Sequence, residues 1–383
     1  MSFAIHGLGT AHPPDSVTAE EGLALARVLA GPDVRTSAWL GPIYANSGIA
    51  RRFQVIGGAA KRDALAGTTH SGSPFLPTPA NDGIGPTTGE RLALYAREVG
   101  PLAVSASSAA LAEAGFAAEA ITHLVTVSCT GFVAPGVDFA LMTGLGLRPT
   151  VARTHVGFMG CHGALNGLRV ANAFATVDPT ARVLVCAVEL CSLHYYYGSA
   201  ADKLVANAIF ADGAAAVVGQ ANPERERRGG QFHPVAHAPG SPAPWRLVAS
   251  GSCLIPNSAE DMGWTIGDHG FEMSLSRRVP GLIAAHLRPW LEAWLRDNGL
   301  SLADVRSWAV HPGGPKIVSA AGESLGLSDV ALEPSRAVFA EYGNMSSPTV
   351  LFILQRLRAR NAPRPCVALG FGPGLVAETA LFV

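Results

Sequence analysis

The feature that most constrains this chain is a cysteine in a glycine-flanked bend, within residues 156–171. Apolar residues lead up to Gly160 and Cys161, and small or apolar residues then recur at helical spacing, at Ala164, Leu165, Leu168 and Ala171. The pattern predicts a strand or loop that turns sharply into a helix, with Cys161 at the turn. Because the N-terminus of a helix favours an anion, we expect the thiol to ionise and act as a nucleophile. The alternative is a buried structural cysteine, the ordinary role of a free cysteine.

Composition narrows the classes of protein that the chain can belong to. Of its 383 residues, 48% are hydrophobic and 15% are charged, which allows two domains or one large duplicated fold with a sizeable core. The net charge of −1 favours neither a nucleic acid nor an anionic membrane as partner. We find no secretory signal and no apolar run of 18 residues. The six cysteines lack zinc-like spacing, which predicts reduced thiols, no metal site and a cytoplasmic protein.

Apolar strands alternate with helices along the whole chain, which predicts an α/β fold with sheets covered on both faces. In the first half, strands are expected at 3–9, 123–129, 182–189 and 210–219, and helices at 20–30, 39–53, 89–114 and 137–145. The second half repeats this scheme, with helices at 278–298 and 346–360 and strands at 308–310 and 366–370. Residues 57–88 are expected to form an irregular segment. A segment rich in Pro, Gly and Arg, residues 222–245, marks the boundary between two halves at 1–230 and 231–383.

Two further polar residues occupy positions where catalytic side chains are often found. His311 follows a short apolar strand and precedes a Gly/Pro turn, and Asn344 precedes a helix. Taken singly, His311 is more often a histidine satisfied by backbone contacts, and Asn344 is consistent with a helix N-cap. Together with Cys161 they supply one nucleophile and two hydrogen-bond donors. Such a set suits carbon–carbon bond formation on thioesters, and it equally suits acyl transfer or thioester hydrolysis.

Six motifs in the chain resemble those of the type III polyketide synthases, the chalcone-synthase-like branch of the thiolase superfamily. The resemblance runs from the first strand to the C-terminus. It rests on residues 160–161, 210–216, 279–281, 311–315, 343–347 and 370–375.

The resemblance implies a thiolase-like, five-layered αβαβα fold of two duplicated halves, and a homodimer. It implies that Cys161 takes an acyl starter from coenzyme A, and that His311 and Asn344 bind the thioester carbonyl of malonyl-CoA as carbon dioxide leaves. The enolate would then attack the acyl group on Cys161, and repeated extension and cyclisation would give an alkylpyrone, an alkylresorcinol or a related phenolic. Such an acyltransferase requires no cofactor beyond its CoA substrates, and the sequence shows no nucleotide-binding fingerprint.

The resemblance also assigns residues to the substrate cavity. Phe210 and Phe271 fall on the two phenylalanines of the family's gate, for which core packing is the plain alternative, and Gly372 and Gly374 fall in the loop that shapes the cavity wall. Where plant chalcone synthases have threonines, this chain has Cys129, Cys191 and His194. Met262 replaces a glycine, and the family's serine is kept as Ser346. These replacements are similar to bacterial members, many of which accept fatty acyl-CoA.

Three cations are predicted to contact CoA: Arg51, Arg52 and Lys316. The alternatives are a solvated helix end for Arg51 and Arg52, and a helix cap for Lys316. Two other functions remain open at this point. One is an initiating ketoacyl-ACP synthase, which shares a Cys-His-Asn set but has different motifs around its histidine and asparagine. The other is a non-catalytic protein of the thiolase fold that only binds acyl chains, although such a binder needs no nucleophile.

Overall fold

The apolar segments of the first half form five neighbouring strands in the computed structural model, which describes residues 2–30, 38–77, 84–222 and 244–383. In spatial order these strands are β5 (Ala152–Gly157), β4 (His123–Ser128), β6 (Arg182–Leu190), β7 (Asp212–Asn222) and β1 (Ser2–Ala11). β4 runs parallel to β5 and β6, whereas β7 runs antiparallel to β6 and β1. Every residue of β6 after Arg182 is buried, as expected for a strand covered on both faces.

The second half repeats this arrangement of strands. Its order is β11 (Ser307–Val310), β12 (Cys366–Gly372), β13 (Val376–Phe382) and β8 (Trp245–Leu254). One parallel pair is followed by two antiparallel pairs, as in the succession β4, β6, β7 and β1. The halves join through a short ladder between β1 and β8, in which Phe3 pairs with Leu247. The predicted α/β fold of two similar halves is therefore confirmed.

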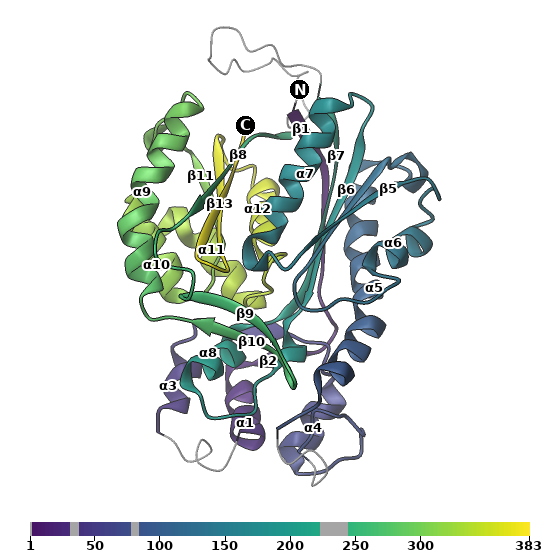
Figure 1. Ribbon diagram of the computed structural model, residues 1–383, viewed down its shortest axis with the longest axis vertical. Coiled ribbons are helices and arrows are strands. Elements are labelled where there is room, and N and C mark those ends of the chain that lie inside the picture. The colour runs from purple at the N-terminus through teal and green to yellow at the C-terminus, as the bar shows by residue number, and fades with distance from the viewer. Residues whose placement is uncertain (1, 31–37, 78–83, 223–243) are drawn as a thin grey trace.

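Helices cover both outer faces and fill the space between the halves (Figure 1). Helices α5 (Thr88–Ala114) and α6 (Val137–Leu145) pack on the first half, and α9 (Val279–Asp297) and α10 (Pro315–Leu325) pack on the second. Between the two halves lie α7 (Gly163–Val177) and α12 (Thr349–Ala359), whose apolar residues share one core cluster with strands of both halves. This gives the five layers αβαβα.

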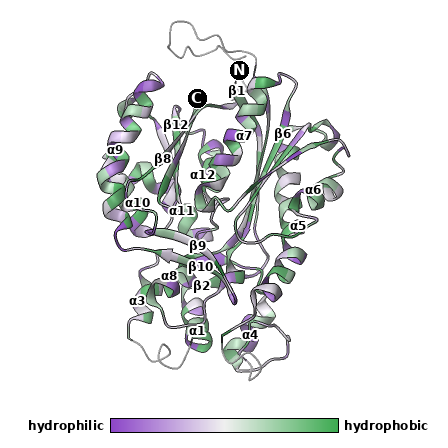
Figure 2. Cartoon of the chain, viewed as in Figure 1, coloured by the Kyte–Doolittle hydropathy of each residue, from purple (hydrophilic) through white to green (hydrophobic). Residues whose placement is uncertain are grey.

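Amphipathic spacing orients the outer helices, and a glycine brings a central helix close to the sheet. The buried face of α9 repeats every four residues, at Val279, Ile283, Leu287, Leu291 and Leu295, and Figure 2 shows hydrophobic and hydrophilic colours alternating along this helix. In α7, a β-carbon built on Gly167 would lie 2.8 Å from Val127. Only glycine therefore allows α7 this close to β4.

The remaining elements gather at the lower end of the molecule in Figure 1 and carry much of the site. They are α1 (Ala19–Leu29), α3 (Leu40–Ala45), α4 (Gly58–Ala66), α8 (Ala201–Ile209), the pair β2 (Ser16–Thr18) and β3 (Arg51–Phe53), and the hairpin β9 (Met262–Gly267) and β10 (Gly270–Leu275). Helix α11 (Asp329–Tyr342) packs on α12. Single 3-10 turns span Ala118–Ala120, Gly160–His162, Cys191–His194 and Leu302–Asp304.

Some sequence predictions differ from the structure. The helix predicted over 39–53 is wrong, because only Leu40–Ala45 is helical and Arg51–Phe53 forms β3. The segment 57–88, expected to be irregular, contains α4. The predicted boundary between 230 and 231 lies outside the described residues and stays a prediction. In the part of the chain that the structure describes, no helix is long and apolar enough to cross a membrane.

Candidate active site

Cys161 lies in the predicted turn between a strand and a helix. β5 ends at Gly157, a 3-10 turn covers Gly160–His162, and α7 begins at Gly163. Gly160 has a positive φ of 69°, and a β-carbon there would lie 2.4 Å from Pro373, so the bend requires glycine. The cysteine is 7% exposed. The predicted elbow is confirmed, with the cysteine two residues before the α-helix.

Asn344 presents its amide group as a hydrogen-bond donor. Its backbone is fixed against the end of α8, where Asn344 N donates to Ile209 O at 2.8 Å and Asn344 O accepts from Ala211 N at 2.9 Å. The side-chain Oδ1 accepts from Ser346 N at 2.8 Å, which identifies Nδ2 as the remaining group. This buried Nδ2 has no hydrogen-bond partner among the described residues. Because α12 begins at Thr349, Asn344 is not its N-cap.

His311 is fully buried at the end of β11, and its backbone N donates to Leu369 O at 2.8 Å. Within the described part of the chain, neither ring nitrogen has a hydrogen-bond partner. Burial, with a smaller contribution from the neighbouring His162, lowers the pKa of His311 to about 3. The ring is therefore neutral near pH 7, with one N–H donor and one acceptor nitrogen.

The Cys161 thiol is also neutral in this structure. Burial, with a smaller contribution from Glu189, raises its pKa to about 11, while the Ser346 hydroxyl and the nearby Asn344 amide act in the opposite direction. Ser346 Oγ donates to Cys161 Sγ at 3.5 Å. The expected thiolate is wrong for this state, because a helix N-terminus contributes about 1 kcal/mol whereas full burial shifts a pKa by up to about 3 to 5 units.

Two cavities share part of their lining, and Cys161 lines the smaller one. An inner chamber of about 30 Å³ is lined by Cys161 together with five of the predicted cavity residues, Cys129, Cys191, Phe210, Met262 and Ser346. An outer cavity of about 290 Å³ is lined by the predicted residues Phe210, Phe271, Cys191, His194 and Arg52. Gly372 and Gly374 do not line the inner chamber, whereas Pro373 between them does. Trp264 and Met273 line both cavities, and the sequence analysis did not find them.

His194 contributes an apolar ring face to the wall, because both of its ring nitrogens are already engaged. Nε2 donates to Thr130 O at 2.6 Å, and Nδ1 accepts from Phe271 N at 2.9 Å. The ring stacks on that of Phe271 with centroids 4.2 Å apart. Burial lowers the pKa of His194 to about 3, so it stays neutral.

Glu189, which no sequence motif singles out, joins the two loops that flank the thiol. This fully buried carboxylate accepts hydrogen bonds from the backbone nitrogens of Cys129 and Thr130, at 2.9 and 3.0 Å. It also accepts from the hydroxyls of Thr130 and Ser347, at 2.7 and 2.6 Å. Burial raises the pKa of Glu189. The only signal in the sequence is an acidic residue within the apolar run 182–190.

The three predicted CoA contacts occupy neighbouring segments. Arg52 lines the outer cavity, but its Nη1 donates to Phe210 O at 2.7 Å, so it also anchors that residue. Arg51 is exposed and lies over the Phe53 ring. Lys316 is exposed on the first turn of α10, next to Pro315, and a β-carbon on Gly48 would lie 3.8 Å from Pro315 Cγ. The segments that carry Arg51 and Lys316 are therefore close together.

No set of three or more His, Cys, Asp or Glu side chains is arranged to hold a metal ion in the described residues. All six cysteines are described, and none is in a disulfide.

Comparison with known proteins identifies the family. Residues 79–223 match the N-terminal domain of the chalcone and stilbene synthases, and residues 246–383 match their C-terminal domain. The chain is 35% identical over 300 residues to the alpha-pyrone synthesis polyketide synthase-like Pks18 of Mycobacterium tuberculosis, covering 77% of this chain and 73% of that protein. It is 37% identical over 284 residues to the 1,3,6,8-tetrahydroxynaphthalene synthase of Streptomyces peucetius subsp. caesius, covering 73% and 72% of the two chains.

Solved structures agree with this assignment. PKS-I from the brown alga Ectocarpus siliculosus superposes with a TM-score of 0.86 at 33% identity, covering 100% of this chain and 98% of that one. The C-terminal type III polyketide synthase domain of Steely1 from Dictyostelium gives a TM-score of 0.85 at 26% identity, covering 100% and 99%. The fold is thiolase-like, and the matched family is one of acyltransferases. The chain belongs to the chalcone and stilbene synthase family, the type III polyketide synthases, which act on acyl-CoA and malonyl-CoA.

Proposed function

We propose that Cys161 carries the growing acyl chain, and that His311 and Asn344 bind the thioester carbonyl of malonyl-CoA. The observation that carries this proposal is the pair of buried groups without partners, the His311 ring and the Asn344 Nδ2. Of the two, the Asn344 amide acts on the Cys161 thiol. A buried donor without a partner costs about 1 to 3 kcal/mol, so its presence calls for a ligand oxygen.

The proposed condensation uses Cys161 as the nucleophile and a neutral His311 ring as a hydrogen-bond donor. Cys161 attacks the starter thioester, the bond from the acyl carbon to the coenzyme A sulfur breaks, and coenzyme A leaves as a thiol that carries the proton lost by Cys161. The bond between the carboxylate and the α-carbon of malonyl-CoA then breaks, and its electron pair forms an enolate whose oxygen is held by N–H donors of His311 and Asn344. The α-carbon attacks the acyl carbon on Cys161, and the sulfur leaves. A low His311 pKa favours this role, because a neutral ring donates a hydrogen bond without protonating the enolate carbon.

Intact-mass spectrometry after incubation with an acyl-CoA tests the nucleophile. The wild type is expected to gain one acyl group, and Cys161→Ala is expected to gain none. Cys129→Ala is the matched control, because Cys129 lines the same chamber, and it is expected to keep the adduct. Absence of any adduct in the wild type would favour the non-catalytic acyl-binding protein. Exclusive use of malonyl-ACP over malonyl-CoA in condensation would favour the ketoacyl-ACP synthase.

We further propose that the product is an alkylpyrone, an alkylresorcinol or a related phenolic. The names of the two bacterial relatives support a cyclised product, an alpha-pyrone in one case and tetrahydroxynaphthalene in the other. The starter, the number of extensions and the mode of closure depend on side-chain positions in the inner chamber to within about 1 Å. Mass spectrometry of products from a panel of acyl-CoA starters tests the proposal. A linear acid as the sole product would contradict it.

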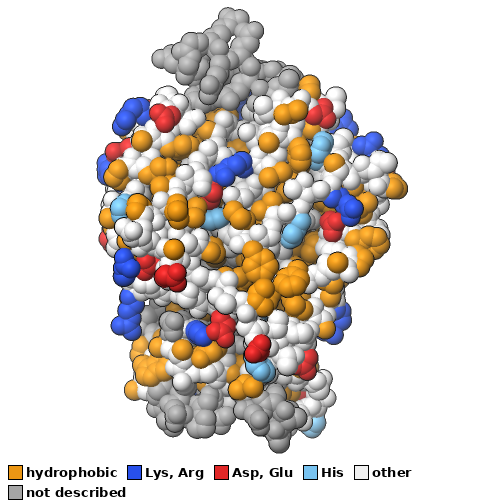
Figure 3. All heavy atoms as spheres, viewed as in Figure 1, with side chains coloured by type: hydrophobic (Ala, Val, Ile, Leu, Met, Phe, Trp, Pro, Cys, Tyr) orange, Lys and Arg blue, Asp and Glu red, His pale blue; other side chains and the backbone are white. Residues whose placement is uncertain are grey.

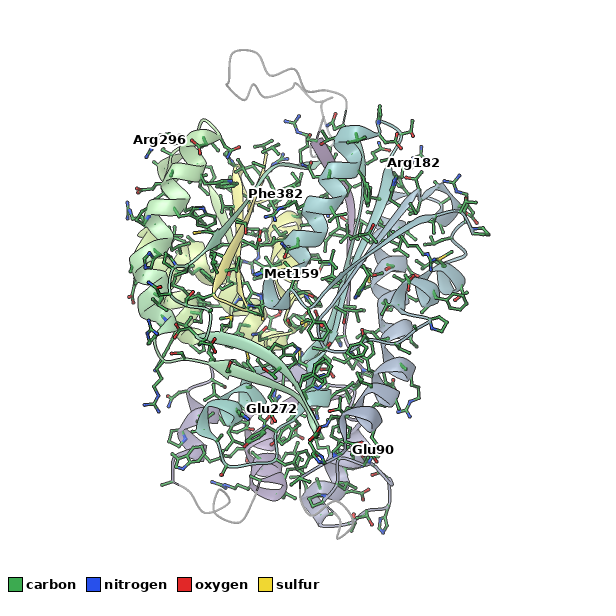
Figure 4. All side chains as sticks on the ribbon, viewed as in Figure 1. Glu90, Met159, Arg182, Glu272, Arg296 and Phe382 are labelled. Atoms are coloured by element: carbon green, nitrogen blue, oxygen red, sulfur yellow. The ribbon has the colours of Figure 1, made fainter. Side chains whose placement is uncertain are left out.

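The chain is proposed to form a homodimer through a hydrophobic patch next to the nucleophile. Phe132, Val133, Phe158 and Met159 are each more than a third exposed, and Phe139 is 50% exposed. Met159 lies near the middle of the face in Figure 4, where hydrophobic side chains gather in Figure 3. Such a patch marks a protein interface. Light scattering is expected to give twice the chain mass for the wild type and a smaller mass for Phe132→Asp; a monomeric wild type would contradict this.

The proposed CoA site combines Arg52, which lines the outer cavity, with Arg51 and Lys316 on nearby segments. Lys316→Ala is expected to raise the Michaelis constant for malonyl-CoA several-fold, because a phosphate contact near the surface contributes about 1 kcal/mol. Lys61→Ala, which removes a lysine paired with Glu21, is the control. An unchanged constant in Lys316→Ala would remove its role.

A cytoplasmic location is proposed from the six unpaired cysteines, which suit a reducing compartment.

We also propose that the enzyme needs only its CoA substrates. Decarboxylation supplies the electron pair for the new carbon–carbon bond, and the reaction as a whole needs no oxidant or reductant. Activity that survives exhaustive treatment with a metal chelator would agree with this, and activity lost until a metal is restored would contradict it.

A further inference from the structure

Arg91 is a fully buried cation without an acidic hydrogen-bond partner in the part of the chain that the structure describes. It lies in the first turn of α5 and is 0% exposed. Nε donates to Pro86 O at 2.8 Å, and Nη1 donates to Leu193 O and Tyr195 O at 2.6 and 3.0 Å. The buried Nη2 has no hydrogen-bond partner among these residues. Burial lowers the pKa of Arg91 to about 10, so the guanidinium keeps its charge near pH 7.

The guanidinium lies directly behind the wall of the outer cavity. Arg91 Cζ is 5.8 Å from the centroid of the Tyr197 ring, and both Tyr197 and Tyr195 line that cavity. A β-carbon built on Gly270 would lie 3.0 Å from Arg91 Nη1, and the residues on either side of Gly270 also line the cavity. Burial lowers the pKa of His194 in the same wall to about 3, and the Arg91 charge contributes. One layer of residues therefore separates this charge from the cavity.

Among the described residues, the lysine, arginine and glutamate side chains that line the outer cavity each lie near an opposite charge. Lys203 pairs with Glu272, which Figure 4 labels on the hairpin. Arg52 lies near the buried Asp212, where burial raises the carboxyl pKa to about 6 and Arg52 acts in the opposite direction. These charges offset one another, so Arg91 leaves about one positive charge without compensation beside the cavity.

Within the described residues, the acidic groups nearest to Arg91 do not neutralise it. Glu90 directly precedes it and is labelled in Figure 4, but this side chain is exposed and accepts from Thr87 N and Oγ1 at 2.8 Å each, as the cap of α5. Burial raises the pKa of Tyr197, so its hydroxyl stays neutral. A buried charge without an opposite charge is costly. An anion in the outer cavity would reduce that cost.

We propose that the outer cavity selects anionic ligands through the charge of Arg91, and that these ligands are enolates of 1,3-dicarbonyl compounds. The inference rests on the proposed function, because each malonyl extension places a new carbonyl group two carbons from the last. The carbon between two carbonyl groups loses a proton far more readily than that of a simple ketone, and the resulting enolate is flat and conjugated. A nearby opposite charge favours the ionised form of such a group, and more strongly in a buried site than in water.

The wall of the cavity suits a flat, conjugated anion. Six of its side chains are aromatic and offer ring faces and edges to such a ligand: Tyr195, Tyr196, Tyr197, Phe210, Trp264 and Phe271. Arg91 acts from behind this wall without touching the ligand, so it determines which charge state the cavity holds and not the position of any one ligand atom.

Two ligands of equal size and different charge test the inference without any condensation. At pH 8, 4-hydroxy-6-pentyl-2-pyrone is an anion, whereas 4-amino-6-pentyl-2-pyrone is neutral and has the same number of heavy atoms. Titration calorimetry gives both dissociation constants, and the ratio of the neutral to the anionic constant measures selectivity for charge. The wild-type ratio is expected to be at least about ten, because unit charges within about 10 Å interact by more than the equivalent 1.4 kcal/mol at an effective dielectric constant of about 20.

Arg91→Gln removes the charge and is expected to bring the ratio to within about twofold of one. Arg91→Lys keeps the charge and is expected to keep at least about a third of the wild-type ratio, although it loses the guanidinium fork as well. A purely structural role would weaken both ligands together and leave the ratio unchanged. Arg97→Gln, on the exposed side of the same helix where Arg97 pairs with Glu98, is the matched control and is expected to keep the wild-type ratio.

Two further variants complete the test. The Phe75 ring lies 5.6 Å from Arg91 Cζ, so Phe75→Glu places a carboxylate beside the guanidinium and is expected to lower the ratio even if Arg91→Gln fails to fold. Ala206→Trp fills the outer cavity and is expected to weaken both ligands by at least about tenfold, which locates their site.

A wild-type ratio near one, no binding of the anion to the wild type, an unchanged ratio in Arg91→Gln or Phe75→Glu, or undiminished binding in Ala206→Trp would overturn the inference. If the ratios follow the expectation but acyl-CoA leaves no adduct on Cys161, the proposed function fails and the selectivity for anions stands. If the adduct forms but the wild-type ratio is near one, the inference fails alone.

Discussion

Ser346 donates a hydrogen bond from its Oγ to the Sγ of Cys161 at 3.5 Å, from a backbone with φ of 57°. The left-handed conformation is uncommon for serine, and here it turns the hydroxyl toward the nucleophile. The same Oγ lies 3.5 Å from Cys129 Sγ, so one hydroxyl contacts two thiols. This contact opposes the rise in the pKa of Cys161 that burial causes.

Ser346→Ala is expected to slow alkylation of Cys161 by iodoacetamide at pH 8 about fivefold. Loss of a hydrogen bond worth about 1 kcal/mol raises the pKa of the thiol and lowers the fraction of thiolate. Alanine retains the β-carbon at positive φ, so the backbone strain is matched. Alkylation at the wild-type rate or faster would show that the hydroxyl does not stabilise the thiolate.

The pH dependence of that alkylation tests whether the cysteine and histidine are both neutral. With a Cys161 pKa of about 11 and a His311 pKa of about 3, the thiolate fraction is small throughout the neutral range. The rate is expected to rise about tenfold for each pH unit from about pH 6 to 9, as the thiolate fraction does below its pKa. A plateau across this range would indicate a preformed thiolate–imidazolium pair instead.

Glu189→Gln is expected to lower the free energy of unfolding by about 2 to 4 kcal/mol. The amide would place a donor against the N–H and O–H donors of Cys129, Thr130 and Ser347, and buried donors without acceptors are costly. The change is measured by urea denaturation. Glu292→Gln, which removes an exposed ion pair with Arg288, is the control and is expected to cost no more than about 0.5 kcal/mol. Equal losses in the two variants would contradict the role of Glu189.

His194 is expected to make the stability depend on pH in the acid range. The unfolded chain binds a proton at this residue below about pH 6.5, whereas the folded chain resists protonation down to about pH 3. The free energy of unfolding therefore falls as the pH falls through this window, and above it the penalty is absent. His194→Gln, which keeps a donor for Thr130 O, removes the titration. From pH 7 to 4 the wild type is expected to lose more stability than the variant. Parallel curves would show that His194 protonates normally.

The sequence allows prediction of those parts of the fold and the site that depend on local spacing. The elbow at Cys161 follows from glycines and helical periodicity, and the strands of the central layers follow from continuous apolar runs. The strand at Arg51–Phe53 does not, because a three-residue strand is defined by its partner β2 and not by its own pattern.

The inner chamber illustrates a second limit of such predictions. Phe271 and Met273 are two residues apart on β10, so they share one face of the strand, and periodicity alone cannot say that Met273 lines the inner chamber and Phe271 does not. That depends on where His194 binds the hairpin. The charge of Cys161 likewise depends on burial by distant segments, whereas the local helix predicts the opposite sign of shift.

The central claim divides the reaction between Cys161, which holds the acyl chain, and His311 with Asn344, which bind malonyl-CoA. The direct test measures release of labelled carbon dioxide from malonyl-CoA and acylation of Cys161 in the same preparations. In Asn344→Ala, decarboxylation is expected to fall at least about 100-fold while acylation stays within about threefold, because one donor to the enolate oxygen is lost. In Cys161→Ala, acylation is expected to vanish while decarboxylation persists. Equal loss of both activities in Asn344→Ala would contradict this division.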